Sequence, residues 1–502
     1  MSKKHYCSEG VTLSPFAHIY QTNSLIGLYN SLSMKLAVGT LTALAPILRA
    51  INNRESKIRI EPKIFSLLKG QGYVIRDIRE ADDYLLSKIR MACLGRLNID
   101  NLKMIVTERC NLACKYCVIQ GNLGAKERID MTQQLAEEAL QLFAQLTRQA
   151  VTAQRIIMLY GGEPLLNWPV CEYIIFRAKE MEAAGNFGGK IALVLETNGT
   201  LITPELARIL RDNHVLVQVS IDGPACVHDI ARKKLNGTGS HADAVRGFEI
   251  ARKAGCICVV SAVFGNHVAS NLKETMDYFI NDLRPATIGL DLLHLIEGQS
   301  NPMDIPTDDL VPAYIRALDG ARKGGLYVEH IVRRIRPFIQ ENIRWKDCPS
   351  CGSRLVIRSD GKVGVCEAFL ASGKYYVPRA GEGSGTPELS AIRQWASRTP
   401  LVNPECKNCP ALTVCGGGCG YNAFVASGDF RNVDTKVCET SKGLLEWAII
   451  EVMALPEISD RALSQGVTMV SRDEKKKILG KIPLEPDTLL TYISKSYELD
   501  GR

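Results

Sequence analysis

Cysteine is the residue that most constrains this chain, because 17 of its 502 residues are cysteines and most of them are grouped. The first group contains Cys110, Cys114 and Cys117, and the second contains Cys348, Cys351, Cys366, Cys406, Cys409, Cys415, Cys419 and Cys438. The odd total and the absence of an apolar h-region in MSKKHYCSEGVTLSPF argue against an exported, disulfide-bonded protein. We therefore expect a cytoplasmic protein with reduced thiols, in which the grouped thiolates bind metal or take part in chemistry.

The remaining composition is that of an ordinary globular protein. Hydrophobic residues make up 46% of the chain and charged residues 23%, which excludes a disordered or fibrous protein. Lys and Arg number 61 and Asp and Glu 54, and a net charge of +7 over this length does not require a polyanionic partner. No stretch approaches 18 uncharged apolar residues. We expect neither a membrane nor a nucleic-acid partner.

Residues 101–300 follow a repeating βα pattern. Amphipathic helical segments separate six apolar runs, which are KMIVTE, RIIMLYGG, IALVLETNG, VLVQVSIDG, CICVVSAVF and TIGLDLLHL. This pattern predicts an α/β fold, a partial (β/α)6 barrel of parallel strands similar to a TIM barrel. Active sites of such folds collect where the strands end, so the residues after each run are the candidate site residues.

The other segments predict four further units. Residues 1–98 predict two strands followed by helices, and residues 301–345 predict a helical connector. Residues 346–440 are rich in cysteine, glycine and turns, and a segment with so little core needs metal sites to hold it together. Residues 441–502 predict a tail that begins with the amphipathic helix SKGLLEWAIIEVMA and ends in a final helix.

The first cysteine group has the spacing Cys110-x3-Cys114-x2-Cys117 on the loop after the first apolar run. Structural zinc prefers four ligands, and no histidine lies near these three cysteines. Three thiolates on one loop fit a [4Fe–4S] cluster with one open iron. The spacing, with the aromatic Tyr116 before the third cysteine, resembles the signature of the radical S-adenosylmethionine (SAM) superfamily. The resemblance implies that the cluster binds SAM and cleaves it to a 5′-deoxyadenosyl radical.

The ends of the next strands resemble the SAM-binding segments of that superfamily. The turn that resembles the segment holding the amino group of SAM consists of Gly161, Gly162, Glu163 and Pro164. The polar residues similar to those that bond its ribose and carboxylate groups are Thr197, Asn198, Ser220 and Asp222. Arg232 is similar to the arginine that pairs with the methionine carboxylate, a pairing that suits a guanidinium group.

The second cysteine group resembles the SPASM domain, a module with two iron–sulfur clusters found in peptide-modifying radical SAM enzymes. The resemblance implies a first auxiliary cluster on Cys348, Cys351, Cys366 and Cys419, and a second on Cys406, Cys409, Cys415 and Cys438. Together with the SAM cluster this makes three [4Fe–4S] clusters. From spacing alone, eight thiolates could also hold two zinc ions. Only two residues separate Cys348 from Cys351, closer than in sulfatase-maturing relatives, so an open iron in the first auxiliary cluster remains an alternative.

Three residues are candidate catalytic groups. Glu367 directly follows Cys366, and in sulfatase-maturing relatives a carboxylate at this position acts as a base. Asp291 and His294 follow the sixth apolar run and are expected to point toward the barrel mouth. The first hundred residues resemble the winged-helix elements with which peptide maturases hold a leader peptide by strand addition.

The resemblance covers residues 101–440 and implies a radical SAM peptide maturase that oxidatively modifies, by crosslinking, a ribosomally made precursor peptide. It also implies an external electron donor of the flavodoxin or ferredoxin type. An anaerobic sulfatase-type maturase that forms formylglycine is the first alternative. A zinc-stapled peptide-binding adaptor without enzyme activity is the second. A radical SAM enzyme acting on RNA is less favoured, because the net charge is modest.

Overall fold

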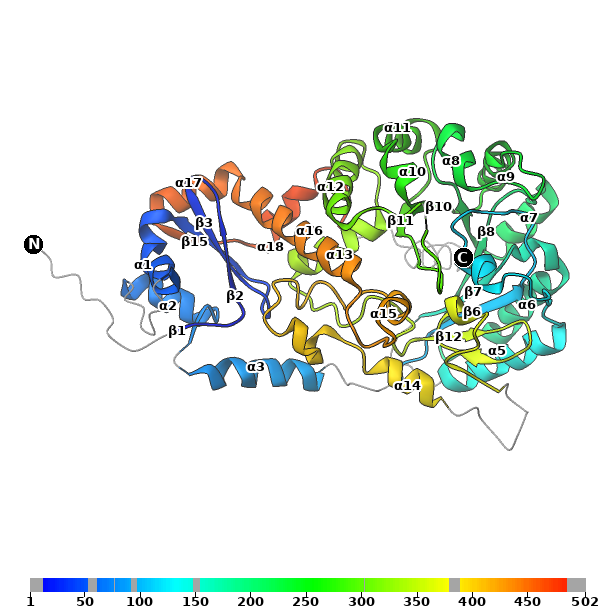
Figure 1. Cartoon of the computed structure of the whole chain (residues 1–502), viewed down its shortest axis with the longest axis horizontal. Helices are drawn as coiled ribbons and strands as arrows, with labels where there is room; N and C mark the ends of the chain where they lie inside the picture. Colours follow the sequence, from blue (N-terminus) through cyan, green and yellow to red (C-terminus); the bar gives the residue numbers. More distant parts are fainter. Residues whose placement is uncertain are drawn as a thin grey trace, which may run out of the picture.

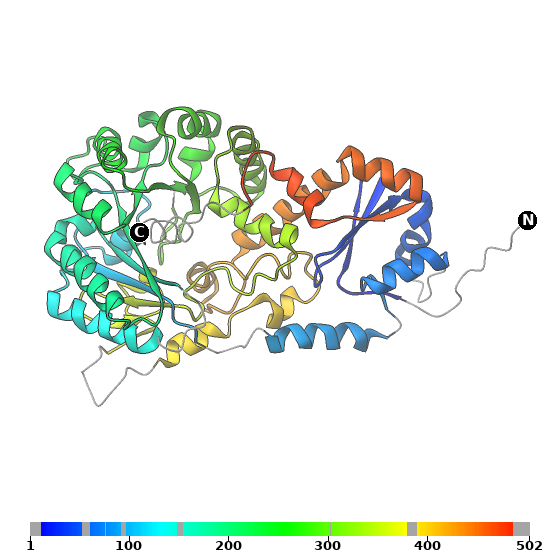
Figure 2. The same ribbon diagram turned by 180° about the vertical axis from the view of Figure 1, so that it is seen from behind.

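The computed structural model describes residues 12–52, 61–75, 77–91, 97–147, 154–301, 303–378 and 389–484. A large α/β unit and a smaller N-terminal sheet lie at opposite ends of the molecule, with the cysteine-rich segment between them (Figures 1 and 2). The final helix that the sequence predicts lies outside the described residues. Within them, no helix is long and apolar enough to cross a membrane.

The α/β unit is built on a sheet whose described strands run in the order β11-β10-β9-β8-β7-β6-β12-β13-β14. Its sequential parallel strands are β6 (Asn101–Thr107), β7 (Gln154–Gly161), β8 (Lys190–Thr197), β9 (Leu216–Ser220), β10 (Cys258–Phe264) and β11 (Ile288–Leu292). These strands coincide with the six predicted apolar runs. The mixed α/β class is confirmed.

The cysteine-rich region extends the same sheet. Its strand β12 (Arg354–Ile357) pairs in parallel with β6, and β13 (Val363–Gly364) and β14 (Tyr376–Val377) continue in antiparallel fashion. Short helices follow, α14 (Ser390–Ala396) and α15 (Gly420–Ser427). The strand β6, which leads to the first cysteine group, therefore lies beside β12, and β12 in turn pairs with β13, the strand that leads to Cys366.

The outer face of the sheet is covered by helices, as buried parallel strands require. These helices are α5 (Gln133–Thr147), α6 (Trp168–Ala183), α7 (Pro204–Asp212), α8 (Ala225–Ala231), α9 (His241–Ala254), α10 (Asn266–Ala269) and α11 (Leu272–Asp277). On the opposite, inner face, Val194, Leu216 and Val259 form a small separate core. Further along the same face the side chains become polar, as at Glu196. The inner face is therefore apolar at one end and charged near the carboxyl ends of the strands.

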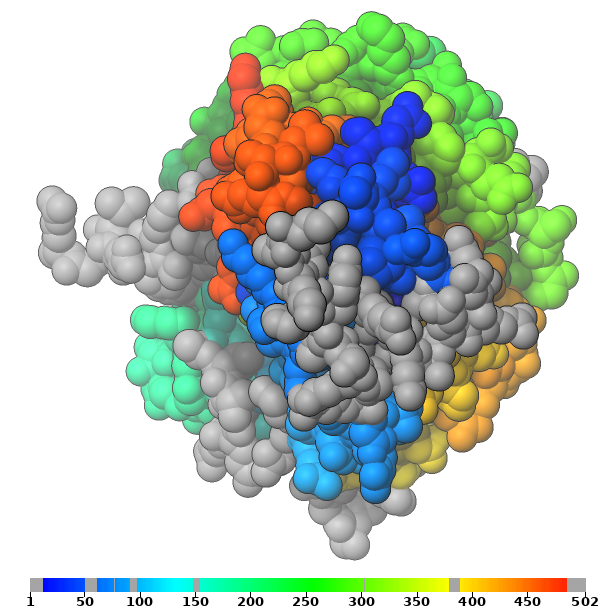
Figure 3. All heavy atoms as spheres, turned by 90° about the vertical axis from the view of Figure 1, so that its left-hand side faces the viewer, coloured from blue at the N-terminus to red at the C-terminus, as the bar shows by residue number. Residues whose placement is uncertain are grey.

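The N-terminal domain is an antiparallel sheet with three helices. Its described elements are β2 (Ala17–Gln21), β3 (Leu25–Asn30), β4 (Leu36–Thr40), α1 (Leu41–Asn52), α2 (Pro62–Gly70) and α3 (Ile78–Met91), with β1 (Thr12–Leu13) paired to β5 (Val74–Ile75). The sequence predicts β3, β4 and the helices but not β2. It also does not predict β15 (Val467–Met469), which comes from the C-terminal tail and pairs with β4. Figure 3 shows the tail beside the N-terminal residues on this face.

The connector and tail are helical and bind the two ends of the chain together. Their helices are α12 (Thr307–Gly324), α13 (Glu329–Gln340), α16 (Thr435–Met453), α17 (Pro456–Gln465) and α18 (Arg472–Lys476). The fully buried Lys475 donates hydrogen bonds to the carbonyl of Met34, at 2.7 Å, and to Glu341, at 2.9 Å. The Thr413 hydroxyl donates to the carbonyl of Ser31 at 2.5 Å. The N-terminal domain is therefore docked on both the tail and the cysteine-rich region.

Candidate functional site

The first cysteine group lies on the loop between the carboxyl end of β6 and α4 (Val118–Leu123). Cys117 caps this helix, and its sulfur accepts a hydrogen bond from the backbone N–H of Gln120 at 3.4 Å. Burial raises the pKa of Cys110 and Cys114 to about 12, and the neighbouring thiols of the group contribute in the same direction. Three thiols on one loop fit the donor set of an iron–sulfur cluster.

The second strand end packs directly on the backbone of this loop. The N–H groups of Gly162 and Glu163 donate to the carbonyls of Thr107 and Arg109 at 2.9 and 2.8 Å. A Cβ atom on Gly161 or Gly162 would lie 2.2 Å from one of these two carbonyl oxygens. Only glycine allows so close an approach of two backbones. The predicted glycine turn therefore shapes the cysteine loop.

Glu163 organises the strand ends from within. Its carboxylate is buried and accepts hydrogen bonds from the Thr197 hydroxyl at 2.6 Å, the Asn198 N–H at 2.7 Å and the Leu165 N–H at 3.1 Å, just beyond Pro164. Burial raises its pKa to about 7, although these donors lower it. The sequence predicts Glu163 as a SAM contact. Because both oxygens are already engaged, the structure assigns it to holding the end of β8 against the glycine turn.

Asn198 connects the end of β8 to the first cysteine group. Its side-chain amide donates to Asn111 at 2.8 Å, and Asn111 donates to the Thr200 hydroxyl at 2.9 Å. Asn111 directly follows Cys110 and is missing from the predicted site, although its position in the loop is a signal for it. Ser220 lies at the end of β9 beside Ser261 of β10.

Asp222 is the centre of a second buried network. The Tyr116 hydroxyl donates to it at 2.5 Å and the Val263 N–H at 2.9 Å, while His267 Nε2 and Arg232 Nε each lie 3.1 Å from a carboxylate oxygen. Burial opposes its ionisation, but Arg232 and His267 hold the pKa of Asp222 well below its usual range. The Arg232 guanidinium also lies 5.3 Å from the centre of the Tyr116 ring.

These contacts give Asp222 and Arg232 a structural role beside their predicted contacts with SAM, which stay a prediction. The sequence predicts that they bind the ribose and carboxylate groups of SAM, whereas in the structure they form a buried ion pair with each other. The segment that contains Arg232 also accepts hydrogen bonds from the cysteine loop, with Ala113 N–H donating to Lys233 and Lys115 N–H to Ala231. Asp222 and Arg232 therefore position the loop and Tyr116. A sequence motif does not show that the Asp222 carboxylate pairs with the Arg232 guanidinium.

We expect Asp222→Asn to lower the free energy of unfolding by about 3 kcal/mol, because Asn keeps the shape but leaves Arg232 buried without a counter-charge. Urea unfolding of the anaerobic protein measures this change. Asp243→Asn is the matched control, since Asp243 pairs with Lys234 and Arg246 at the surface, where a pair contributes at most about 1 kcal/mol. Equal losses in the two variants would contradict the assigned role of Asp222.

Four thiols of the second cysteine group line one small cavity in the cysteine-rich region, of about 20 Å³. They are Cys406, Cys409, Cys415 and Cys438. Burial raises the pKa of Cys406 to about 12, and the other three thiols add to the shift. This is the set that the sequence predicts for the second auxiliary cluster, and its donor chemistry fits one.

The remaining four thiols form a separate set. Burial raises the pKa of Cys366 well above its usual value, with further contributions from Glu367, Cys419 and Cys348. The pKa of Cys351 is raised to about 12 by burial, and Cys348 again contributes. These four thiols are the set that the resemblance implies for the first auxiliary cluster, and their assignment to it stays a prediction. Among the described residues, no group of three or more His, Cys, Asp or Glu side chains is placed to hold a single metal ion.

Arg398 holds the loop that lies between the two auxiliary sets. Its buried guanidinium donates hydrogen bonds to the carbonyls of Gly417, Gly418, Phe430 and Asn432. Cys415 and Cys419 stand on either side of these glycines. One arginine thus fixes the spacing between a thiol of one set and a thiol of the other.

Glu367 has different surroundings from those expected for a base. Lys103 Nζ donates to its Oε1 at 2.9 Å, and Arg354 Nη1 lies 3.8 Å from its Oε2. Burial would raise its pKa, but Lys103 and Arg354 lower it to about 2. A carboxylate with so low a pKa is a weak base at neutral pH. The prediction of Glu367 as the base is therefore not supported by its environment.

Asp291 is also committed to internal partners, whereas His294 lies beside a thiol. Asp291 on β11 accepts a hydrogen bond from the Ser261 hydroxyl at 2.8 Å and pairs with His330 Nε2 at 2.6 Å. Burial opposes its ionisation, but His330 holds its pKa well below the usual range. His294 Nδ1 lies 3.8 Å from the sulfur of Cys419. His294 is therefore adjacent to the first auxiliary set.

Lys103 and Arg354 are missing from the predicted site. Lys103 Nζ lies 3.9 Å from the centre of the Tyr160 ring and 3.5 Å from Glu196 Oε2, in addition to its contact with Glu367. A lysine inside the otherwise apolar strand NLKMIVT is the signal that could have identified it, because a buried charge requires a partner.

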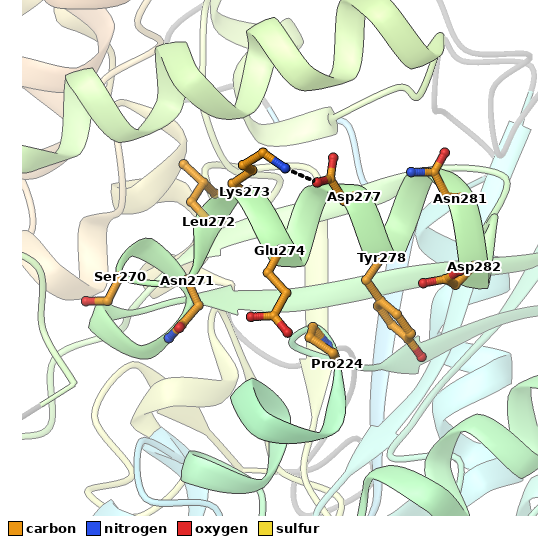
Figure 4. A pocket seen from close by; sticks show the side chains of 10 residues that line it. All are labelled: Pro224, Ser270, Asn271, Leu272, Lys273, Glu274, Asp277, Tyr278, Asn281 and Asp282. Atoms are coloured by element: carbon orange, nitrogen blue, oxygen red, sulfur yellow. Dashed lines mark hydrogen bonds and ion pairs between the residues drawn. The ribbon is translucent and has the colours of Figure 1, made fainter.

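A wide groove lies on the outer side, away from these residues. It has a volume of about 620 Å³ and is lined by Pro224, Ser270, Asn271, Leu272, Lys273, Glu274, Asp277, Tyr278, Asn281 and Asp282 (Figure 4). The groove follows α11 and the adjoining π-helix Tyr278–Leu283. None of the predicted site residues lines it.

Comparisons with known proteins agree with this geometry. Residues 104–279 match the model of the radical SAM superfamily. The radical SAM cyclopropyl synthase TigE of Paramaledivibacter caminithermalis is 26% identical over 76% of this chain and 80% of its own length. The cysteine-type anaerobic sulfatase-maturating enzyme of Clostridium perfringens is 26% identical over 62% of this chain and 85% of its own length.

Solved structures share the fold. Native anSMEcpe with bound AdoMet has a TM-score of 0.58 at 20% identity and covers 72% of this chain and 99% of its own. SuiB of Streptococcus suis bound to S-adenosylmethionine has a TM-score of 0.51 at 16% identity and covers 85% of this chain and 99% of its own. Residues 104–279 thus form a radical SAM domain, and the chain is a radical SAM enzyme similar in sequence to TigE and to the sulfatase-maturating enzyme.

Proposed function

We propose that this chain is a radical SAM maturase that oxidatively modifies, by crosslinking, residues of a ribosomally made precursor peptide. The observation that supports this most directly is that Lys103 contacts both Glu196 and Glu367. Glu196 precedes Thr197, a predicted SAM contact, and Glu367 follows Cys366 of the first auxiliary set. A substrate residue at the inner face, which we interpret as the interior of a partial barrel, would lie between the first cysteine group and the first auxiliary set. This arrangement suits hydrogen-atom removal followed by loss of an electron.

The thiols of the chain divide the cofactor roles. Cys110, Cys114 and Cys117 would hold a [4Fe–4S] cluster with an open iron for SAM, and each auxiliary set would hold a further cluster. When bound, the first cluster and SAM supply the 5′-deoxyadenosyl radical, with electrons from a flavodoxin- or ferredoxin-type donor. The protein residues position these groups and exclude water, since the hard chemistry belongs to the cofactors.

The N-terminal sheet offers an edge for an extended leader segment. Two backbone hydrogen bonds flank the β2–β3 ladder. The Ser31 N–H donates to the Phe16 carbonyl, and the Thr22 N–H donates to the Leu25 carbonyl. Because bonded and non-bonded pairs alternate in an antiparallel ladder, Ile19 and Gln21 direct their backbone groups away from β3. The strand β15 covers the other edge, so in the described residues β2 is the edge left open on this sheet. We assign this edge to the leader segment, by strand addition.

Gln21→Pro tests this assignment. Proline removes an N–H that points away from the sheet and leaves the β2–β3 ladder intact. We expect precursor binding to weaken about tenfold, the effect of losing one hydrogen bond of ~1 kcal/mol plus a steric clash. Fluorescence anisotropy with labelled precursor measures the effect, and Gln21→Ala is the control because it keeps the N–H. Similar binding by both variants would place the leader elsewhere.

The proposed reaction is tested by a search for a short precursor gene beside this one, co-expression with the peptide it encodes, and mass spectrometry of that peptide. A crosslink gives a SAM-dependent loss of two hydrogens and a product that does not react with a hydrazide probe. Formation of a hydrazide-reactive aldehyde would instead support the second candidate, a formylglycine-forming sulfatase maturase, which the similarity to the Clostridium perfringens enzyme favours. An unchanged peptide would contradict both.

A further inference from the structure

Two carboxylates share one lysine on the inner face of the large sheet. Lys103 Nζ lies 2.9 Å from Glu367 Oε1 and 3.5 Å from Glu196 Oε2. The lysine side chain is only 6% exposed, and each carboxylate side chain is 17% exposed. The cluster is thus nearly closed, with a small part of each carboxylate side chain still exposed.

The two carboxylates are not equivalent. Glu367 accepts the hydrogen bond from Lys103, and its second oxygen faces Arg354 at 3.8 Å. Glu196 has only the longer ion pair with Lys103, and no hydrogen bond to its carboxylate is found in the described part of the chain. The carboxylate of Glu196 therefore has lone pairs free to accept a hydrogen bond from a substrate. The carboxylate of Glu367 already accepts one from Lys103.

Position separates them further. Glu196 is the residue before Thr197 at the carboxyl end of β8, the strand end that contacts Glu163 and Asn111 of the SAM side. Glu367 lies in the short helix after Cys366. Glu196 is therefore the carboxylate nearer in the chain to the residues that surround the first cysteine group.

The charged groups that act on Glu196 come from β6, β11, β12 and the short helix Glu367–Phe369. Burial raises its pKa above the ordinary carboxyl value, with Glu367 and Asp291 acting in the same direction. Lys103 and Arg354 act in the opposite direction without cancelling the shift. A raised pKa brings a carboxylate closer to the operating pH, which favours general base catalysis.

We propose that Glu196 is the catalytic base that takes the substrate proton during oxidative bond formation, an inference that rests on the proposed function. The substrate first loses a hydrogen atom from carbon to the 5′-deoxyadenosyl radical. Its carbon radical then forms a bond to a neighbouring heteroatom. The X–H bond of that atom breaks, with the proton going to the Glu196 carboxylate and one electron to an oxidised iron–sulfur cluster. One C–H and one X–H bond are thus replaced by one C–X bond.

Glu196→Gln and Glu367→Gln form a matched pair, because each removes one carboxylate from the same lysine. We expect Glu196→Gln to form 5′-deoxyadenosine from SAM and precursor but to lower the rate of crosslinked product by about 10²–10⁴-fold. Glu367→Gln should lower it less than about tenfold, since Lys103 stays beside Glu196. Iron content and SAM binding, measured in parallel, show whether each variant is correctly assembled.

A second readout does not depend on turnover. We expect the infrared difference spectrum between the wild-type chain and Glu196→Gln, recorded across pH with the clusters assembled, to contain a carboxylic acid band above the ordinary carboxyl range. Glu163, whose pKa is also raised, is present in both proteins, so its band cancels in the difference. The product rate of the wild-type enzyme should fall as pH decreases through the same transition, because the base works only when deprotonated.

The outcomes separate the two proposals. Wild-type product rates from Glu196→Gln, or an equal loss from Glu367→Gln, would overturn the assignment of Glu196 while the maturase function stands. If no peptide is modified by the wild-type enzyme, the proposed function fails, and the infrared band still tests the protonation of Glu196. A band that is unchanged in Glu196→Gln would overturn the assignment independently.

Discussion

Replacing Cys110, Cys114 and Cys117 together by Ala is expected to abolish formation of 5′-deoxyadenosine from SAM and dithionite. The three thiols share one loop, and no fourth cysteine belongs to their group, so their removal eliminates the proposed SAM-binding cluster. The iron content should fall from about twelve to about eight per chain, because the auxiliary sets are built from other residues. Anaerobic iron analysis and chromatography of the nucleoside products measure both quantities.

Cys258→Ala is the matched control for this variant. Cys258 is buried in β10 and belongs to neither cysteine group, so its removal tests the general effect of losing a core thiol. It should keep about twelve irons and normal SAM cleavage. If the triple variant still produced 5′-deoxyadenosine, the SAM-cleaving site would have to be assigned to another part of the chain.

Replacing Cys406 and Cys409 by Ala is expected to remove the second auxiliary cluster alone. Both thiols line the cavity that also contains Cys415 and Cys438, and a site reduced to two thiols cannot hold four irons. We expect about eight irons, unchanged SAM cleavage and no crosslinked peptide, because an electron acceptor is lost. The absorption spectrum and peptide mass spectra measure these effects.

Metal analysis of the wild-type protein is the control for this prediction. Anaerobically reconstituted protein should contain about twelve irons. Iron near four together with bound zinc would contradict the assignment of iron–sulfur clusters to the second cysteine group. If the variant lacking Cys406 and Cys409 also lost SAM cleavage, the cavity would instead be needed for the fold of the whole molecule.

Much of the α/β unit could be predicted from the sequence because its signals are local. Each parallel strand is a short apolar run, and each helix has an apolar stripe, so both elements can be read within a window of about ten residues. The same holds for the helices α12 and α13. The strand β15 could not be predicted, because three residues at Val467–Met469 acquire strand structure only by pairing with β4, more than 400 positions away.

The candidate site divides in the same way. A cluster bound by one loop requires cysteines at a fixed spacing, and this spacing is visible in the sequence. The close contact of two backbones before Glu163 requires glycine, which is visible there as well. The protonation state of a side chain cannot be read from the sequence. Whether Glu367 or Glu196 has the more basic carboxylate depends on the position of Lys103, which lies far from both in the chain.

The sequence by itself determined the types of residue available and their local geometry: thiols in two groups, βα repeats, and the turns at which strands end. The tertiary structure alone decided how charges are paired, including Asp222 with Arg232. The physical reason is that hydrophobic periodicity and ligand spacing act between neighbours in the chain. Electrostatic energies depend instead on distances and burial, which arise only when remote segments pack together.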